Sequence, residues 1–368
     1  MNMLIHAQTL KGRVRDLRMS EPVIHADNEA KGRSGHLGHA MADLGGGRVI
    51  AFSANTSAIR RDGHAAFGYM EYRFSDNYGE SFGEPHLLPF SYETLLDGIY
   101  TVSVEKAVVL TDGTLAVFCL MNSQSEPISC EPWARPLVLL SHDGGISWDD
   151  PIPFSAYEGR VYDALIRDGI VYALEFCNDA KESFLGSKDE HLYRLFVSTD
   201  GCQSFEERSV VPFDTKGRGY GNLIFTDRGD LIAYAYNANA EDHLDYAISS
   251  DGGMSWHTVG ASLVKNKIRN PQVGRIDGQY VLHGRAGESE AGTGAFVIYT
   301  SADGILWDEG KVLVEGRPAC FYSENLTLTL PSGKERMLIK YSENYQDPVP
   351  GVWSGRVNSM MLTLESLD

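Results

Sequence analysis

The sequence is poor in basic residues and in cysteine. Against 50 Asp and Glu it has only 32 Lys and Arg, which gives a formal net charge of -18. A chain with this charge is not expected to present a basic surface to nucleic acid. The five cysteines are odd in number and form no CxxC or Cys/His cluster with metal-ligand spacing. We therefore expect no nucleic-acid partner, and neither a metal nor an organic cofactor is implied.

Long hydrophobic runs and long helical periodicity are also missing. No stretch of the sequence approaches the roughly 18 apolar residues that a membrane-spanning helix needs. The N-terminal residues contain no apolar run of signal-peptide length. We therefore expect no membrane span and a cytoplasmic protein, or a secreted one if a leader precedes this sequence.

One short pattern, Ser-x-Asp-x-Gly-x-Ser-aromatic, recurs along the chain. Residues 141–148 and 249–256 fit it fully, and residues 198–205 lack one glycine. Residues 75–82 have Asn in the Asp position, and residues 301–307 are one residue short and lack the second hydroxyl. In such a turn the carboxylate or amide accepts backbone N–H groups, glycine supplies a positive φ, and the aromatic packs between sheets. We interpret these residues as structural rather than catalytic.

The spacing of these turns predicts the fold. They are centred on Asn77, Asp143, Asp200, Asp251 and Asp303, in steps of 66, 57, 51 and 52 residues. Each step suits a four-stranded propeller blade with its loops. A sixth unit between residues 321 and 364 supplies three strands, and residues 4–10 or 22–25 would add the fourth. We therefore predict an all-β protein, a six-bladed β-propeller of four-stranded antiparallel blades closed by an N-terminal strand, with residues 1–368 as one domain.

The five turns resemble the Asp-box, or BNR, repeats of the sialidase superfamily, and the resemblance covers nearly the whole chain. It implies that the turns lie on the face away from the site. The loops that join second and third strands then gather on the opposite face, at residues 53–67, 121–135, 175–191, 236–245, 283–294 and 341–354. The superfamily also contains other glycosidases, polysaccharide lyases and non-catalytic propellers, so the fold alone leaves the activity open.

The resemblance also implies catalytic residues. Sialidases use a Tyr nucleophile, a Glu that activates it, an Asp acid/base and arginines that grip a carboxylate. Tyr322 opens the sequence Tyr-Ser-Glu-Asn-Leu, which is similar to the tyrosine signature at the start of the last blade. Asp62 lies in the blade-one stretch that carries the acid/base in the family. We therefore expect Tyr322 as nucleophile and Asp62 as acid/base.

The activating glutamate has no match at the start of blade four, where the sequence reads Gly-Tyr-Gly-Asn from residue 219. Glu105, Glu175 and Glu324 are the candidates to replace it. Glu175 ends an apolar strand that faces the rim, and such a place raises the pKa of a carboxyl group.

The arginines match the family least. The family's first arginine opens blade one, and the corresponding segment here contains His36 and His39 instead. Guanidinium groups suit a carboxylate because their fork of donors binds both oxygens. The candidate grips are Arg60, Arg61, Arg269, Arg285 and Arg317. His36 and Glu105 are further candidate substrate contacts.

Three functions remain open from the sequence. The first is a glycosidase for an acidic or otherwise specialised terminal sugar, with Tyr322 and Asp62 in the roles above. The second is a uronate-type polysaccharide lyase, in which His39 or His64 acts with a tyrosine. The third is a non-catalytic propeller that binds a glycan or a protein. A carbohydrate partner is expected, and the oligomeric state is left open.

Overall fold

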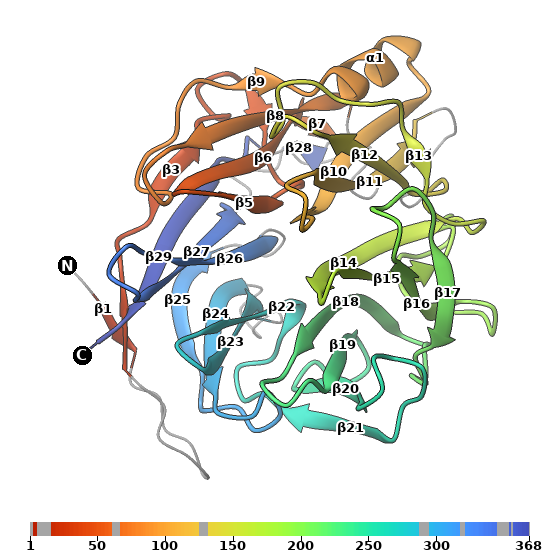
Figure 1. Ribbon diagram of the computed structural model, residues 1–368, viewed down its shortest axis with the longest axis vertical. Helices are drawn as coiled ribbons and strands as arrows, with labels where there is room; N and C mark the ends of the chain where they lie inside the picture. The colour runs from red at the N-terminus through yellow and green to blue at the C-terminus, as the bar shows by residue number, and fades with distance from the viewer. Residues whose placement is uncertain are drawn as a thin grey trace.

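Six antiparallel sheets surround a central axis, and each sheet is one blade of a propeller (Figure 1). The computed structural model describes residues 3–5, 16–60, 67–124, 132–286, 294–316, 321–343, 353–354 and 356–367. The predicted all-β architecture of six blades, each built on four antiparallel strands, is confirmed. We number the blades one to six in chain order.

In every blade the strands follow one another from the axis outward. The innermost strands are β5 (Met41–Gly45), β10 (Tyr100–Val109), β14 (Gly159–Arg167), β18 (Arg218–Phe225), β22 (Arg269–Ile276) and β26 (Ser323–Thr329). The second strands are β6 (Arg48–Ser57), β11 (Leu115–Ser123), β15 (Ile170–Cys177), β19 (Leu231–Asn237), β23 (Gln279–Arg285) and β27 (Glu335–Ser342). The third strands are β8 (Gly68–Ser75), β12 (Leu137–Ser141), β16 (Leu192–Ser198), β20 (His243–Ser249), β24 (Gly294–Ser301) and β29 (Ser359–Ser366). The outer strands are β9 (His86–Leu87), β13 (Ile152–Pro153), β17 (Glu206–Val210), β21 (Thr258–Leu263) and β25 (Lys311–Gly316).

The N-terminal part of the chain completes blade six. Strands β2 (Leu17–Met19) and β3 (Val23–Ala26) both pair antiparallel with β29 near the C-terminus. The expected closing segment at residues 22–25 overlaps β3, whereas β1 (Met3–Ile5) pairs with β2 and not with β29. The Asn28 backbone N–H also donates to Asn358 Oδ1 at 3.0 Å. Closure by an N-terminal strand is therefore confirmed.

A short helix was not expected from the sequence. Helix α1 (Pro89–Asp97) lies between β9 and β10, begins with Pro and ends at Gly98, whose φ is 72°. Its buried residues are Ser91 and Thr94, whose hydroxyls donate to the carbonyls of Leu88 and Phe90. The buried face of the helix is therefore polar, and the sequence lacks the apolar residues at helical spacing from which a helix is predicted. The remaining short strands are β4 (Arg33–Ser34), which pairs with β6, and β7 (Ile59–Arg60), which pairs with β28 (Trp353–Ser354).

Apolar side chains fill the spaces between neighbouring blades. Successive residues of a strand point to opposite faces of its sheet. In β6, Ile50 and Phe52 pack toward blade two, while Val49 and Ala51 pack with Leu338 of blade six. The aromatic that ends each repeated turn packs against one of these interfaces, as expected. These aromatics are Phe82, Trp148, Phe205, Trp256 and Trp307.

The repeated turns are held by their Asp or Asn side chain. Asp143 accepts the backbone N–H groups of Ile146 and Ser147 at 3.0 and 2.8 Å, and the Ser141 hydroxyl at 2.9 Å. The Ser147 hydroxyl donates to the second oxygen at 2.5 Å, and this bond contributes most to holding the pKa of Asp143 below its usual range. In blade one, Asn77 makes the equivalent bonds without a charge.

We expect Asp143→Ala to lower the melting temperature more than Asp143→Asn does, because the amide can repeat what Asn77 does in blade one. Because the pKa of Asp143 is lower in the folded protein than in the unfolded chain, its carboxylate stabilises the folded protein fully at pH values above the unfolded-state pKa. This stabilisation is lost as the pH falls through the folded-state pKa. The advantage of Asp143 over Asn should therefore disappear in acid. Thermal unfolding of both variants across pH measures this, and equal losses for Ala and Asn at neutral pH would contradict it.

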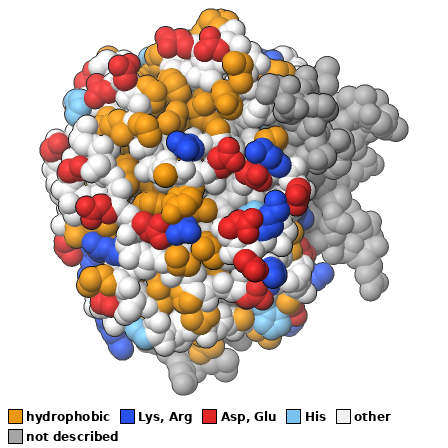
Figure 2. Space-filling view, turned by 90° about the vertical axis from the view of Figure 1, so that its right-hand side faces the viewer, with side chains coloured by type: hydrophobic (Ala, Val, Ile, Leu, Met, Phe, Trp, Pro, Cys, Tyr) orange, Lys and Arg blue, Asp and Glu red, His pale blue; other side chains and the backbone are white. Residues whose placement is uncertain are grey.

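Charges of both signs are mixed on the surface. Figure 2 shows one side of the molecule, where acidic and basic side chains are interspersed among apolar ones. Among the described residues, no helix is long and apolar enough to cross a membrane.

Candidate active site

The innermost strands of blades two to five each carry an irregularity in their pairing, close to the axis. In β10, β14, β18 and β22 the pairing with the second strand shifts and leaves an extra residue. These residues are Glu105, Tyr162, Tyr220 and Asn270. Tyr220 and Asn270 have positive φ values of 47° and 55°, which are uncommon for residues other than glycine. A bulge re-aims the side chain it carries, and all four of these residues line one cavity.

This cavity, which we call the site cavity, lies at the axis and has a volume of about 40 Å³. Segments of all six blades line it. They are Leu37, Gly38 and His39 of blade one, Glu105 and Lys106, Arg160 and Tyr162, Tyr220, Asn270 and Gln272, and Tyr322, Ser323 and Glu324 of blade six. The structure thus brings together four of the expected site residues, His39, Glu105, Tyr322 and Glu324.

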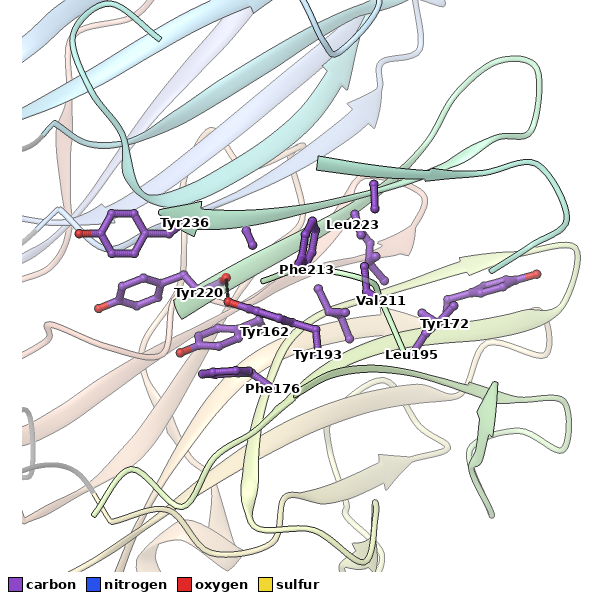
Figure 3. Close-up of a cluster of buried hydrophobic side chains, with 14 of the residues drawn as sticks. Tyr162, Tyr172, Phe176, Tyr193, Leu195, Val211, Phe213, Tyr220, Leu223 and Tyr236 are labelled. Carbon is purple, nitrogen blue, oxygen red and sulfur yellow. Dashed lines mark hydrogen bonds between the residues drawn. The ribbon is translucent and has the colours of Figure 1, made fainter. Parts of the chain in front are cut away.

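Tyr322 is buried and held in place by both its backbone and its hydroxyl. Its N–H donates to Ser342 Oγ at 3.0 Å. Its hydroxyl lies 3.3 Å from that of Tyr220, which comes from blade four. Tyr220 is fixed in turn, because the Tyr193 hydroxyl donates to its carbonyl at 2.8 Å. Figure 3 shows Tyr162, Tyr220 and Tyr236 side by side with their hydroxyls on the same side.

Arg269, another expected residue, lies beside these tyrosines. Its guanidinium is between two rings, 5.4 Å from the centre of Phe184 and 5.6 Å from that of Tyr236. Burial acts to lower the pKa of Arg269, but the neighbouring phenols, Tyr220 and Tyr322 among them, outweigh burial and raise it. No carboxylate of the described residues lies within ion-pair distance of Arg269. Arg285, also expected, is opposite Arg269 in the β22–β23 register and is buried.

An ion pair between Glu105, which was expected from the sequence, and Arg160, which was not, forms the wall of the site cavity at blades two and three. Arg160 Nε and Nη2 donate to the same oxygen of Glu105, Oε2, at 2.9 and 2.5 Å. Oε1 of Glu105 is buried and has no hydrogen-bond partner among the described residues. Arg160 also lies over the Tyr162 ring, 4.9 Å from its centre. Arg160 was missed, because nothing in its sequence neighbourhood marks it as the partner of Glu105.

The two expected histidines take different places. His39 lines the site cavity, and its Nε2 is 3.2 Å from the carbonyl oxygen of His36. Burial, with a smaller effect of Lys340, holds the pKa of His39 well below its usual range. His36 is fully buried, with Nδ1 3.2 Å from the Ser34 hydroxyl, and is not among the cavity residues. His39 is therefore neutral at pH 7, while His36 lies within blade one.

A network of polar side chains crosses the channel beneath the site cavity. Its five members, one from each of blades two to six, are Lys106, Asp163, Asn222, Gln272 and Glu324. Lys106 contacts Glu324, lies 3.1 Å from Asp163 and donates to Gln272 at 2.8 Å. Asn222 donates to Asp163 at 2.6 Å. We call this group the channel network. On its other side, a second cavity of about 350 Å³ follows the channel toward the opposite face.

Glu175, expected as a catalytic residue, lies elsewhere. It is fully buried in β15, packed against Gly159 and outside the residues that line the site cavity. Burial raises the pKa of Glu175 to about 8, although Ser155 and Arg194 act in the opposite direction. The structure therefore agrees with the raised pKa expected for this residue, but it does not bring Glu175 to Tyr322.

We expect Glu175→Gln to stabilise the protein in alkaline solution. The folded-state pKa of about 8 exceeds the ordinary value of 4.5, so folding retains a proton that the unfolded chain releases. Glu175 therefore makes the wild type less stable as the pH rises from about 4.5 to 8, and the deficit is constant above that. Replacement by Gln removes this loss of stability, so the free energy of unfolding should increase by on the order of 3 kcal/mol at pH 9 and by little at pH 4. Denaturant unfolding at both pH values measures this; a gain independent of pH would contradict it.

Five of the expected residues cannot be placed by their side chains. Arg61, Asp62 and Arg317 lie outside the described residues, as does His64. Arg60 is described only as part of β7, which pairs with β28. Among the described residues, no group of three or more His, Cys, Asp or Glu side chains is arranged to hold a metal ion.

Comparison with known proteins identifies the fold. No family model matches the sequence, and no curated protein matches it significantly. Among solved structures, a protein of unknown function from Dyadobacter fermentans superposes with a TM-score of 0.66 and 16% identity, over 95% of this chain and 99% of that one.

Sialidases superpose almost as well. A Hadza microbial sialidase gives a TM-score of 0.64 at 12% identity, over 94% of this chain and 68% of that one. The intramolecular trans-sialidase from Ruminococcus gnavus gives 0.60 at 12% identity, over 92% and 96%. The chain therefore has the sialidase-like six-bladed propeller fold, as predicted from the sequence. Sequence identities as low as 12% support a shared fold and not a shared activity.

Proposed function

We propose that this protein, built on the sialidase-like propeller, is a glycoside hydrolase that removes a terminal acidic sugar from a glycan. The observation that carries the proposal is the place of Tyr322, at the axis, with its hydroxyl 3.3 Å from that of Tyr220 and beside the buried cation of Arg269. A tyrosine needs positioning and a nearby positive charge to act as a nucleophile. Such a site needs a nucleophile, a cation and a cavity. Tyr322 lies immediately before β26, Arg269 begins β22, and the cavity lies between the innermost strands.

In this proposal the sugar carboxylate binds the guanidinium of Arg269. Among the described residues that guanidinium has no carboxylate partner, so it offers its donors to the substrate. The Tyr322 oxygen attacks the anomeric carbon as its proton passes to Glu324, one of the glutamates expected to activate it and a residue of the same cavity. The bond to the aglycone breaks, and the departing oxygen takes a proton from Asp62, the acid expected from the sequence. Water then cleaves the tyrosyl–sugar bond, giving one proton to Asp62 while the phenol oxygen takes its proton back from the glutamate. Glu105 Oε1, a buried acceptor without a partner among the described residues, is suited to a sugar hydroxyl.

The test is a panel of fluorogenic glycosides that includes sialosides, uronides and neutral sugars, assayed with the wild type and the Tyr322→Phe variant. Release of the fluorophore from an acidic glycoside only, lost in the variant, supports the proposal. Release from neutral sugars only would contradict the acidic substrate. Binding of glycans without release on any member would favour a non-catalytic propeller.

A second candidate is a polysaccharide lyase, and the observation that favours it is His39. Its imidazole is neutral, lines the site cavity, and has a buried Nδ1 without a hydrogen-bond partner among the described residues. As a base it would remove the proton next to a uronate carboxylate; the C–O bond to the leaving sugar then breaks, a C=C bond forms, and a tyrosine hydroxyl protonates the leaving oxygen. Ultraviolet absorbance of the unsaturated product distinguishes this reaction from hydrolysis.

A further inference from the structure

One buried side chain of the site cavity has no part in the reaction as proposed. Asn270 lies in the bulge of β22, is only 4% exposed, and lines the cavity together with Tyr220 and Tyr322. Neither its Oδ1 nor its Nδ2 has a hydrogen-bond partner among the described residues. Buried amides are almost always hydrogen-bonded, because an unpaired polar group loses the water that it binds in the unfolded chain. Asn270 therefore offers a donor and an acceptor that the described part of the chain leaves unused.

Two other amide side chains close to the axis make hydrogen bonds within the protein. Asn222 belongs to the channel network and accepts the backbone N–H of Val273 at 3.1 Å. Gln272, two positions after Asn270 on the same strand, accepts a hydrogen bond from the Lys106 ammonium at 2.8 Å. The fold can therefore satisfy an amide at this place, and Asn270 is the one of these three that it leaves unpaired.

The backbone of Asn270 is also in an unfavourable conformation. Its φ of 55° is left-handed, whereas the proline that follows at position 271 biases the preceding residue toward an extended conformation. The opposite strand allows the bulge because it has Gly284 there, where a Cβ would lie 2.7 Å from the Asn270 carbonyl oxygen. Glycine adopts a positive φ without steric cost. The conformation alone would therefore be met better by glycine, and it does not explain an asparagine at this position.

We propose that Asn270 is a specificity-determining residue that hydrogen-bonds one hydroxyl group of the sugar, at the cost of stability in the free protein. The proposal rests on the proposed function for the identity of the ligand as a sugar. Arg269, the proposed partner of the sugar carboxylate, lies close enough to Tyr220 and Tyr322 to interact with them electrostatically. The same two tyrosines line the site cavity with Asn270. A sugar held by Arg269 therefore lies beside the residues that surround Asn270.

A hydroxyl group fits the site cavity in size and in chemistry. The cavity volume of about 40 Å³ accommodates a hydroxyl group or a water molecule, but not a sugar ring. A hydroxyl both donates and accepts hydrogen bonds, as an amide does. A deoxy sugar would place a C–H group there, exclude water and leave the amide unpaired. Sites built to hydrogen-bond a substrate hydroxyl reject the analogue that lacks it for this reason, so Asn270 should select against one deoxy sugar.

Thermal unfolding of the free protein is the first test. Asn270→Gly removes both the unpaired amide and the side chain at a positive φ. We therefore expect its melting temperature to rise by about 1 to 3 °C. Gln272→Ala is the matched control, because it removes an amide of the same strand that has a partner, and its melting temperature should fall. An unchanged or lower melting temperature in Asn270→Gly would show that the amide supports the fold, and would overturn the proposal.

The second test measures kcat/KM for a sialoside, a uronide and the monodeoxy analogues of whichever is cleaved. The wild type should lose about 10- to 100-fold on the analogue without the recognised hydroxyl. Asn270→Gly should lose a similar factor on the parent sugar and treat the parent and that analogue alike. Gln272→Ala should keep the wild-type ratio between the two. An equal loss in Asn270→Gly on the parent and on every analogue would overturn the proposal, because the amide would then recognise no hydroxyl.

If the wild type cleaves no glycoside, the proposed function fails, and binding decides the role of Asn270. The probes are then the methyl glycosides of sialic acid and of glucuronic acid with their monodeoxy analogues, added to ¹⁵N-labelled protein. The side-chain amide signal of Asn270 is assigned by its absence from the Asn270→Gly spectrum. A shift of this signal with a parent sugar, absent with one of its deoxy analogues, would support the proposal. No shift with any probe, or the same shift with a parent and all its analogues, would overturn it.

Discussion

Replacing Tyr322 with phenylalanine is expected to lower turnover at least about 1,000-fold while the propeller remains folded. The change removes a single oxygen, the one that we propose forms the bond to the sugar. The ring itself can stay, because its packing against Tyr220, with ring centres 6.2 Å apart, does not need the hydroxyl. The backbone bond to Ser342 is also unaffected. The loss should therefore lie in kcat, with little effect on stability.

Tyr220→Phe is the matched control, because its hydroxyl lies 3.3 Å from that of Tyr322 and both residues line the site cavity. Removing a hydrogen-bond partner of the nucleophile should cost about 10-fold, far less than removing the nucleophile. Single-turnover kinetics and thermal unfolding of both variants make the comparison. Equal losses in the two variants, or retention of activity in Tyr322→Phe, would exclude Tyr322 as the nucleophile and direct attention to His39.

Arg269→Met is expected to remove the preference for an acidic sugar. Charged hydrogen bonds contribute up to about 3 kcal/mol each, and this corresponds to a loss of about 100-fold in kcat/KM. Methionine keeps an unbranched chain between Phe184 and Tyr236, so the packing of this region should be preserved. The loss should apply to the carboxylate substrate and not to a neutral analogue.

The measurement compares the acidic glycoside with its carboxamide on the wild type and the variant. We expect the wild type to prefer the acid and Arg269→Met to treat the two alike. Arg269→Lys should fall between them, since lysine keeps the charge but loses the planar fork of donors. A preference for the acid that survives in Arg269→Met would show that another cation holds the carboxylate, and Arg285, opposite in the strand register, would be the next to replace.

The fold could be predicted from the sequence because its signal is local and repeated. Each turn around residues such as Asp143 or Asp251 is stabilised by atoms within a few positions of itself. Such a turn is recognisable wherever it occurs, and five copies, together with the strand-rich unit between residues 321 and 364, gave the number of blades. The helix α1 escaped prediction for the opposite reason. Its buried face consists of Ser91 and Thr94, which satisfy the backbone and do not follow an apolar helical period.

The candidate site was less predictable because it is assembled from six separate blades. Tyr322 was found through its neighbours in sequence, whereas Arg160 carries no local mark of its place beside Glu105. For Glu175, by contrast, the sequence predicted the local environment but not the location of the side chain. The end of an apolar strand correctly suggested burial and a raised pKa, but only the packing of the blades decides which interface such a side chain enters. The channel network likewise joins Glu324 to Lys106, which is more than 150 positions away in sequence.

The closing of blade six has a consequence for how the protein is made. The strands that seal the ring, β2 and β3, are made before blades one to five, whereas their partner β29 is made after them. The hydrogen bond between Asn28 and Asn358 joins residues 330 positions apart. Until β29 has been made, β2 and β3 lack this partner, and the blades that have already formed expose edges that invite pairing with other chains. The ring, and with it the cavity to which all six blades contribute, is complete only once β29 has joined β2 and β3.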